Sequence, residues 1–205
     1  MTDPAHNSHE QGIHVENGIA YGVVGADLHV WGDGTPPLFV LENWRDQGAA
    51  PTGRTADLDK LHRWRDNDAS FAVRWLYGPQ GTGKTRLAAT FASESSASNW
   101  KVIVAAAGPG MAPEGQDLSL GKADGVLLIV DRADSWPASS LALLLTNALF
   151  RRRPDRRTRT RVLLIGTTAD DWPALRYKLS ADQPALSSQR LDTQRGGRLP
   201  QGRQC

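Results

Sequence analysis

The chain has 205 residues, 40% of them hydrophobic and 22% charged, with a formal net charge of +2 at pH 7. This length and composition suffice for one hydrophobic core and predict one compact domain. A charge so near neutrality gives no support for a nucleic-acid partner, and no apolar run reaches the roughly 18 residues of a membrane span. The lone cysteine, Cys205, excludes an internal disulfide. We therefore expect a cytoplasmic protein with neither a membrane nor a nucleic-acid partner.

The N-terminal quarter of the chain is irregular. Residues 1–18 lack helical or strand periodicity and are predicted to be disordered, whereas residues 19–44 alternate apolar runs with glycine turns and predict a small β-rich appendage. Residues 32–34, Gly-Asp-Gly between two apolar runs, predict a hairpin, and the two prolines that follow predict an edge position for its second strand. Residues 45–56 are a predicted linker.

A phosphate-binding motif lies near the middle of the chain, in a predicted domain of residues 57–180. The sequence Gly78-Pro-Gln-Gly-Thr-Gly-Lys-Thr85 satisfies the P-loop pattern G-x-x-x-x-G-K-[ST], between a predicted strand and a predicted helix. Glycines let backbone N–H groups approach phosphates, and the helix N-terminus adds partial positive charge. Lys84 is expected to contact the β- and γ-phosphates, and the Thr85 hydroxyl to ligate Mg²⁺. The predicted nucleotide-binding residues are Gly78, Pro79, Gln80, Gly81, Thr82, Gly83, Lys84, Thr85, Arg86 and Thr167.

A predicted helix over residues 57–66 leads into this unit, with Leu58, Leu61 and Trp64 on one face. Trp64 has two interpretations. It either stacks on a nucleotide base or packs against the sheet, and packing is favoured because large aromatic side chains usually fill cores.

A second signature is the apolar run of residues 125–130, which ends at Asp131. It is typical of a Walker B strand, buried in a parallel sheet with a carboxylate at its C-terminal end, where ligands bind. Asp131 is therefore a predicted Mg²⁺ ligand, together with Thr85.

The chain then echoes itself. Residues 126–138 align without gaps to residues 162–174, and nine of the thirteen positions are identical. Each copy predicts a buried strand, an acidic turn and a Trp-Pro at a helix start, so the two strands are expected to be parallel neighbours whose ends share one site. The second copy has Thr167 and Thr168 at its strand end, and either is a candidate contact for the γ-phosphate.

Two polar segments complete the chain. The arginine-rich segment of residues 151–161 is read as a solvated loop, because no aromatic residue is interleaved as in a nucleic-acid site, although one of its arginines could reach a neighbouring subunit's nucleotide. Residues 181–205 are rich in Gln, Arg, Gly and Ser, and are predicted to be a disordered tail.

With these motifs in view, residues 57–179 resemble the P-loop NTPase core of STAND and AAA-like ATPases, especially the actinobacterial type. The resemblance is carried by the P-loop continuing as GKTRLA and by the Leu-Ile-Val-Asp-x-Ala-Asp-x-Trp-Pro block. It implies a three-layer α/β/α sandwich on a mostly parallel sheet, with ATP and Mg²⁺ as cofactors and a protein partner or self-association. The lid, winged helix and repeats of that group are absent, so the chain looks truncated after the core.

Two departures from the family pattern bear on hydrolysis. One is at the end of the second echoed strand, where this chain has Thr167 and Thr168 and related switches often have arginine. The other follows the Walker B aspartate. Many hydrolytic members have an acid directly after the Walker B aspartate, where this chain has Arg132. Asp134 is the candidate substitute, so the predicted catalytic residues are Lys84, Asp131 and Asp134. The sequence thus predicts a Mg²⁺-dependent regulatory ATPase, or a remnant of one, with slow hydrolysis. The alternative is a nucleotide-gated binding module that does not turn over, and a small-molecule kinase ranks last.

Overall fold

The computed structural model of the protein describes residues 20–24, 27–31, 39–45, 54–107, 121–146, 159–179 and 185–192. The predictions for residues 1–18, for most of the linker, for residues 151–158 and for residues 193–205 lie outside these ranges. None of the helices within them has the length and hydropathy needed to cross a bilayer.

A six-stranded sheet with the order β3-β5-β6-β7-β4-β8 forms the centre of the molecule. β3 pairs antiparallel with β5, and the other neighbours pair in parallel. The C-terminal ends of the five parallel strands therefore lie at one edge of the sheet, where ligands bind in folds of this kind. The strands are β3 (Phe39–Asn43), β4 (Phe71–Tyr77), β5 (Trp100–Ala107), β6 (Gly125–Val130), β7 (Arg159–Gly166) and β8 (Ala185–Arg190).

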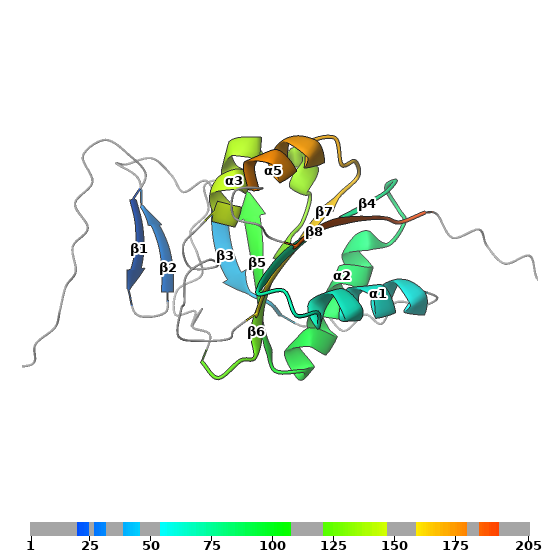
Figure 1. Ribbon diagram of the computed structural model, residues 1–205, viewed down its shortest axis with the longest axis horizontal. Coiled ribbons are helices and arrows are strands. Elements are labelled where there is room, and N and C mark those ends of the chain that lie inside the picture. Colours follow the sequence, from blue (N-terminus) through cyan, green and yellow to red (C-terminus); the bar gives the residue numbers. More distant parts are fainter. Residues whose placement is uncertain are drawn as a thin grey trace, which may run out of the picture.

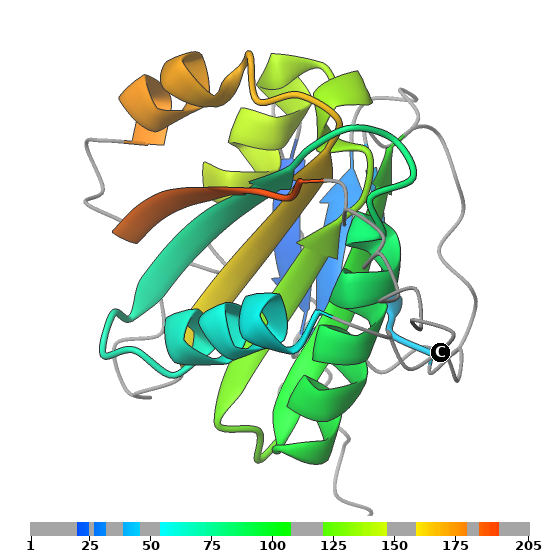
Figure 2. The same ribbon diagram turned by 90° about the vertical axis from the view of Figure 1, so that its right-hand side faces the viewer.

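Helices cover both faces of this sheet (Figures 1 and 2). α1 (Thr55–Arg65) and α2 (Lys84–Ala97) lie on one face, and α3 (Ala138–Thr146) and α5 (Trp172–Leu179) lie on the other. The predicted three-layer α/β architecture with a mostly parallel sheet is confirmed.

The core has two halves because side chains alternate along each strand. On β6, Val126, Leu128 and Val130 pack toward α3 and α5, whereas Leu127 and Ile129 pack toward α1 and α2. Every residue of this strand is buried, as expected for the centre of a parallel sheet. The prediction that the two echoed strands are parallel neighbours is confirmed by the pairing of β6 with β7.

The N-terminal strands differ from the prediction. β1 (Ala20–Val24) and β2 (Asp27–Trp31) form a separate antiparallel pair, so the hairpin lies before the predicted turn at residues 32–34, and that hairpin prediction is wrong. The sequence predicts β3 as part of the appendage, but β3 is an edge strand of the main sheet. The edge position itself agrees with the two preceding prolines, which cannot donate ladder hydrogen bonds.

The prediction of disorder over residues 181–205 is wrong for residues 185–192. β8 pairs in parallel with β4 along its full length. Leu191 follows it, buried in the half of the core beside α1 and α2, and its backbone N–H donates to the Tyr77 carbonyl at 2.6 Å. Backbone pairing to β4 and the burial of Leu191 stabilise this polar segment. Neither feature produces a periodic pattern in the sequence.

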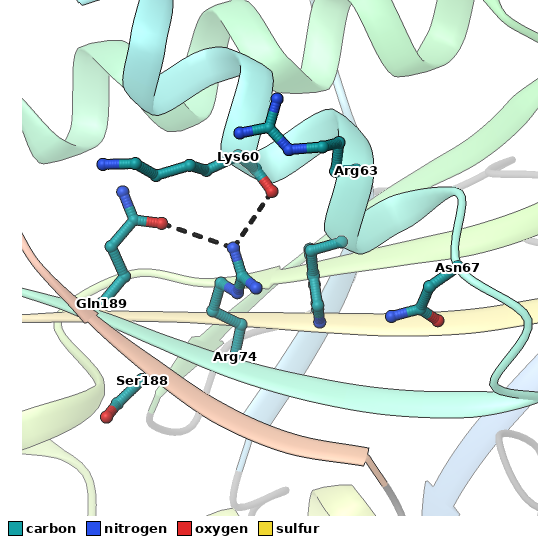
Figure 3. Close-up of a pocket in the computed structure, with 7 residues that line it drawn as sticks. Lys60, Arg63, Asn67, Arg74, Ser188 and Gln189 are labelled. Carbon is teal, nitrogen blue, oxygen red and sulfur yellow. Dashed lines mark hydrogen bonds between the residues drawn. The ribbon is translucent and has the colours of Figure 1, made fainter.

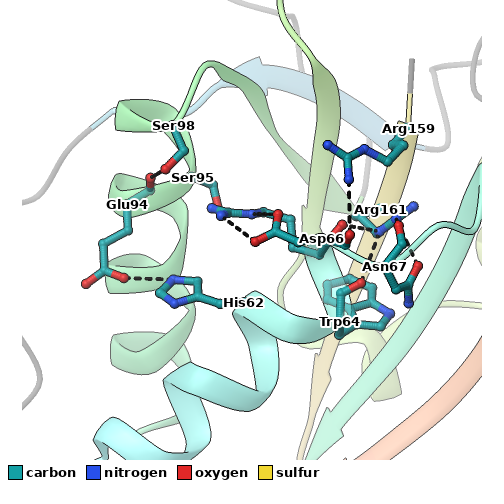
Figure 4. A network of polar contacts seen from close by, with 10 residues as sticks. His62, Trp64, Asp66, Asn67, Glu94, Ser95, Ser98, Arg159 and Arg161 are labelled. Atoms are coloured by element: carbon teal, nitrogen blue, oxygen red, sulfur yellow. Dashed lines mark hydrogen bonds and ion pairs between the residues drawn. The ribbon is translucent and has the colours of Figure 1, made fainter. Parts of the chain in front are cut away.

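The solvated-loop prediction fails for Arg161, which lies on β7 and is fully buried. Its guanidinium donates to the backbone carbonyls of the turn that joins α1 to β4, shown in Figure 4. Burial lowers the pKa of Arg161 to about 10. The side chain thus satisfies carbonyls that the end of a helix leaves without partners. The carbonyls that it contacts belong to Trp64, Arg65, Asn67, Ala69 and Thr160.

Candidate functional site

The predicted phosphate loop joins β4 to α2 at the edge of the sheet where the parallel strands end. Gly81 and Gly83 have φ angles of +80° and +82°, a left-handed region that side chains with a Cβ rarely adopt. Gly78 is needed for a different reason, because a Cβ there would lie 2.1 Å from the Leu191 carbonyl oxygen. The end of β8 therefore packs directly against the start of the loop.

Lys84 is the first residue of α2, and its side chain folds back into the loop. Its Nζ donates to the carbonyl oxygens of Gly78 at 2.7 Å and Pro79 at 2.9 Å. Burial lowers the pKa of Lys84, whereas the carboxylates of Asp134 and Asp131 act to raise it. Both predicted acids are therefore near enough to influence the charge of this amine, although its hydrogen bonds go to the loop.

Asp131 and Asp134 lie in the turn that follows β6, and they have different partners. The Asp131 carboxylate accepts the N–H of Arg132 at 2.9 Å, and Arg132 has the left-handed φ of +49°. The Asp134 carboxylate reaches across to the end of β7, where it accepts the N–H of Thr167 at 2.6 Å, the N–H of Thr168 at 3.3 Å and the Thr167 hydroxyl. Burial acts to raise the pKa of Asp134, but these hydrogen bonds hold it below its usual value.

These groups line one cavity of about 710 Å³. Its volume lies within the range of small-molecule sites, which is roughly 300–1,000 Å³. The structure brings all three predicted catalytic residues to it, whereas Gly78, Pro79 and Thr82 form the part of the loop that encloses Lys84. The lining residues are Gln80, Gly81, Gly83, Lys84, Thr85, Arg86, Asp131, Arg132, Asp134, Ser135, Ile165, Gly166 and Thr167.

The residues present fit a magnesium ion bound together with phosphates. Mg²⁺ is usually held by one or two protein oxygens plus substrate phosphates and water. Thr85 and Asp131 supply a hydroxyl and a carboxylate to the same cavity. Within the described ranges, no group of three or more His, Cys, Asp or Glu side chains could hold a metal by itself.

Sequence reasoning missed one residue beside the loop, Arg54, and four residues of the cavity lining, which are Arg132, Ser135, Ile165 and Gly166. Gly166 lines the cavity, and a Cβ there would lie 3.1 Å from Cγ of Asp134, so a glycine permits the approach of that acid. Its signal in the sequence was the replacement of Val130 by glycine in the echo. Arg54, just before α1, lies 3.9 Å from the position of a Cβ on Gly83 and donates to the Asp192 carbonyl at 2.8 Å. Arg132 also lines the cavity, directly after the predicted Mg²⁺ ligand Asp131.

Trp64 lies in the core and not in this cavity. It is 4% exposed and packs near Phe91 at a ring separation of 6.3 Å. The packing interpretation of this side chain therefore agrees with the structure.

Comparisons with known proteins identify no family. No protein-family model matches the sequence, and no curated protein matches it. Among solved structures, the chain is similar to the Aeropyrum pernix ORC2 protein in its ADPNP-ADP complexes, with 18% identity and a TM-score of 0.49, and in its ADP form, with 18% identity and a TM-score of 0.48. Each alignment covers 71% of this chain and 50% of the other, so the chain spans about half the length of these proteins.

Proposed function

We propose that the protein binds ATP with Mg²⁺ and is a regulatory ATPase of the STAND or AAA-like type, or the core of one, with slow hydrolysis. The observation that carries this proposal is the convergence of Lys84, Thr85, Asp131 and Asp134 on one cavity beside a glycine loop. The lone cysteine is in keeping with a cytoplasmic location.

Each group has a proposed role. The loop N–H groups and Lys84 bind the phosphates, and Thr85 and Asp131 would hold Mg²⁺, which when bound would supply positive charge to the phosphates. Asp134 is the acid placed to orient a water molecule. Its Oδ2 already accepts hydrogen bonds from Thr167 and Thr168, which limits its availability as a base and is the reason we propose slow turnover.

Nucleotide binding is tested by titrating a fluorescent ATP analogue with Mg²⁺ into the wild type, Lys84→Ala and Lys122→Ala. Lys122 is an exposed lysine before β6, at the opposite edge of the sheet, and serves as the matched control. Loss of charged hydrogen bonds to phosphate should weaken binding by about tenfold or more in Lys84→Ala only. Equal affinity in all three proteins would refute the proposal.

A specific observation favours the alternative of a binding module without turnover, because Arg132 follows Asp131 and Asp134 is engaged with β7. Single-turnover hydrolysis separates the two functions. ATP cleavage that is lost in Asp134→Ala would support the ATPase. Tight binding without cleavage in the wild type would support the module.

A further inference from the structure

A second pocket lies on the α1 side of the sheet and shares no lining residue with the cavity at the phosphate loop. It has a volume of about 420 Å³ and opens between α1, β4 and β8, as Figure 3 shows. Its described lining contains three cationic side chains and no acidic one. The lining residues are Lys60, Arg63, Trp64, Asn67, Arg74, Ser188 and Gln189.

Arg74 is the central cation of this pocket. Its Nε donates to the Ser187 hydroxyl at 3.1 Å, and its Nη1 donates to the Lys60 carbonyl at 3.1 Å and to Oε1 of Gln189 at 3.3 Å. Within the described ranges, Nη2 makes no hydrogen bond and no carboxylate pairs with the guanidinium. Burial lowers the pKa of Arg74 to about 10, as expected for a cation without a compensating acid.

Two neighbouring donors also lack acceptors among the described residues. Nε1 of Trp64 is buried without a hydrogen-bond partner. The amide oxygen of Asn67 accepts from Arg161 at 3.0 Å and from the Ala69 N–H at 3.1 Å, so the Asn67 amide nitrogen is the group left to donate. A buried donor such as Nε1 of Trp64 is costly when it has no acceptor, so a ligand oxygen that reaches it would be favoured.

The remaining charged and accepting groups of the lining also leave this pocket with more donors than free acceptors. Arg63 is exposed and makes no ion pair within the described part of the chain, whereas Lys60 pairs with Asp57 at 3.2 Å. The carbonyl of Lys60 and the side-chain oxygen of Gln189 already accept from Arg74. The pocket therefore offers donors and positive charge but few free acceptors.

We propose that this pocket binds the phosphate group of a small phosphorylated molecule. A phosphate monoester is an anion with several acceptor oxygens, which complements a set of donors, and a guanidinium binds such oxygens in a fork. The volume exceeds what a bare phosphate fills and leaves room for a sugar-sized group. The site does not depend on nucleotide binding at the phosphate loop.

The test uses the full chain with Lys84→Ala as background, which weakens phosphate binding at the loop. Inorganic phosphate, ribose 5-phosphate and ribose are titrated at constant ionic strength, and tryptophan indole N–H signals are followed by ¹H–¹⁵N NMR. The Trp64 signal is assigned from its loss in Trp64→Phe. We expect saturable shifts of this signal with both phosphates and none with ribose. Tighter binding of ribose 5-phosphate than of phosphate identifies the organic group as part of the ligand, and equal binding restricts the site to the phosphate.

Variants in the same background locate the site. Arg74→Gln should weaken phosphate binding by about tenfold or more, and Arg63→Gln by a smaller factor of about two to five, as expected for an exposed charge. Arg176→Gln, an exposed arginine on α5 across the sheet, is the control and should have no effect. If Arg74→Gln does not fold, the proposal is tested by comparing the phosphate affinity of Arg63→Gln with that of Arg176→Gln. A Trp64 signal that does not move, or equal affinity in Arg63→Gln and Arg176→Gln, would overturn the proposal.

Discussion

Leu191 directly follows β8 and is buried in the core. We predict that Leu191→Ala strongly destabilises the fold. The side chain is 1% exposed and packs among the residues between the sheet, α1 and α2. Truncation of a core leucine to alanine lowers the free energy of unfolding by about 2–5 kcal/mol. The hydrogen bond from the backbone N–H of residue 191 to the Tyr77 carbonyl is kept in this variant. We therefore expect the free energy of unfolding to fall by about 2–4 kcal/mol. The total for a domain is roughly 5–15 kcal/mol.

The free energy of unfolding is measured by urea titration, followed by far-UV circular dichroism. Leu186→Ala is the matched control, because Leu186 lies on β8 in the same segment but is half-buried and packs against the other half of the core. We expect its loss to be about 1 kcal/mol, the typical size for a point substitution. The difference between the two variants then reports the burial of Leu191 itself.

The same substitution is expected to reach the phosphate loop, because the Leu191 carbonyl lies against Gly78. A shift of this turn changes the start of the loop, so the affinity for the ATP analogue should fall in Leu191→Ala and stay unchanged in Leu186→Ala. A change in unfolding free energy within about 0.5 kcal/mol, the usual range for surface substitutions, would refute the reasoning. It would mean that residues 185–192 do not pack on β4.

Three further predictions concern single side chains. Gly166→Ala places a Cβ 3.0 Å from the Thr168 carbonyl oxygen and 3.1 Å from Cγ of Asp134, so the melting temperature should fall with a loss of about 1–3 kcal/mol, and an unchanged melting temperature would contradict this. Arg161→Met leaves several buried carbonyls without donors and should cost more than about 3 kcal/mol in urea unfolding, against a small effect for Arg159→Met, which loses one bond to the Asp66 carbonyl. Because the pKa of Asp134 is lowered in the folded state, its contribution to stability is present above the unfolded pKa and is lost as the pH falls through the folded pKa. The stability difference between the wild type and Asp134→Asn should therefore be larger at pH 7 than at pH 3, and a constant difference would contradict the assignment.

The parts of the fold that the sequence predicted are those with a strong local signal. Gly81 and Gly83 of the phosphate loop have left-handed φ, β6 is an unbroken apolar run, and β7 contains the apolar run of residues 162–165. The convergence of Lys84 and Asp131 follows from the rule that parallel strands end at one edge of a sheet. Each of these signals is contained within a few consecutive residues.

The parts that the sequence did not predict depend on distant partners. β8 reads Ala-Leu-Ser-Ser-Gln-Arg, a polar run whose stabilising contacts are backbone bonds to β4, more than a hundred residues earlier. Arg161 belongs to an arginine-rich segment, and its burial becomes evident only when the carbonyls at the end of α1 are placed beside it. Neither case has a local pattern, because the partner lies elsewhere in the chain.

The internal echo explains how the candidate site is assembled. The two copies are identical over most of the strand and at Trp136 and Trp172, which are both buried, and they differ at consecutive positions of the strand end, where Val130-Asp-Arg is replaced by Gly166-Thr-Thr. Because the strands are parallel neighbours, these differing ends meet, and Asp134 of the first copy accepts the N–H groups of Thr167 and Thr168 in the second. A valine at position 166 would place a Cβ 3.1 Å from Cγ of Asp134, which is closer than ordinary van der Waals contact, so the glycine of the second copy favours this approach. The shared strand residues and tryptophans thus form the scaffold, and the cavity is lined by the divergent residues Asp131, Arg132, Gly166 and Thr167 together with the shared residue Asp134.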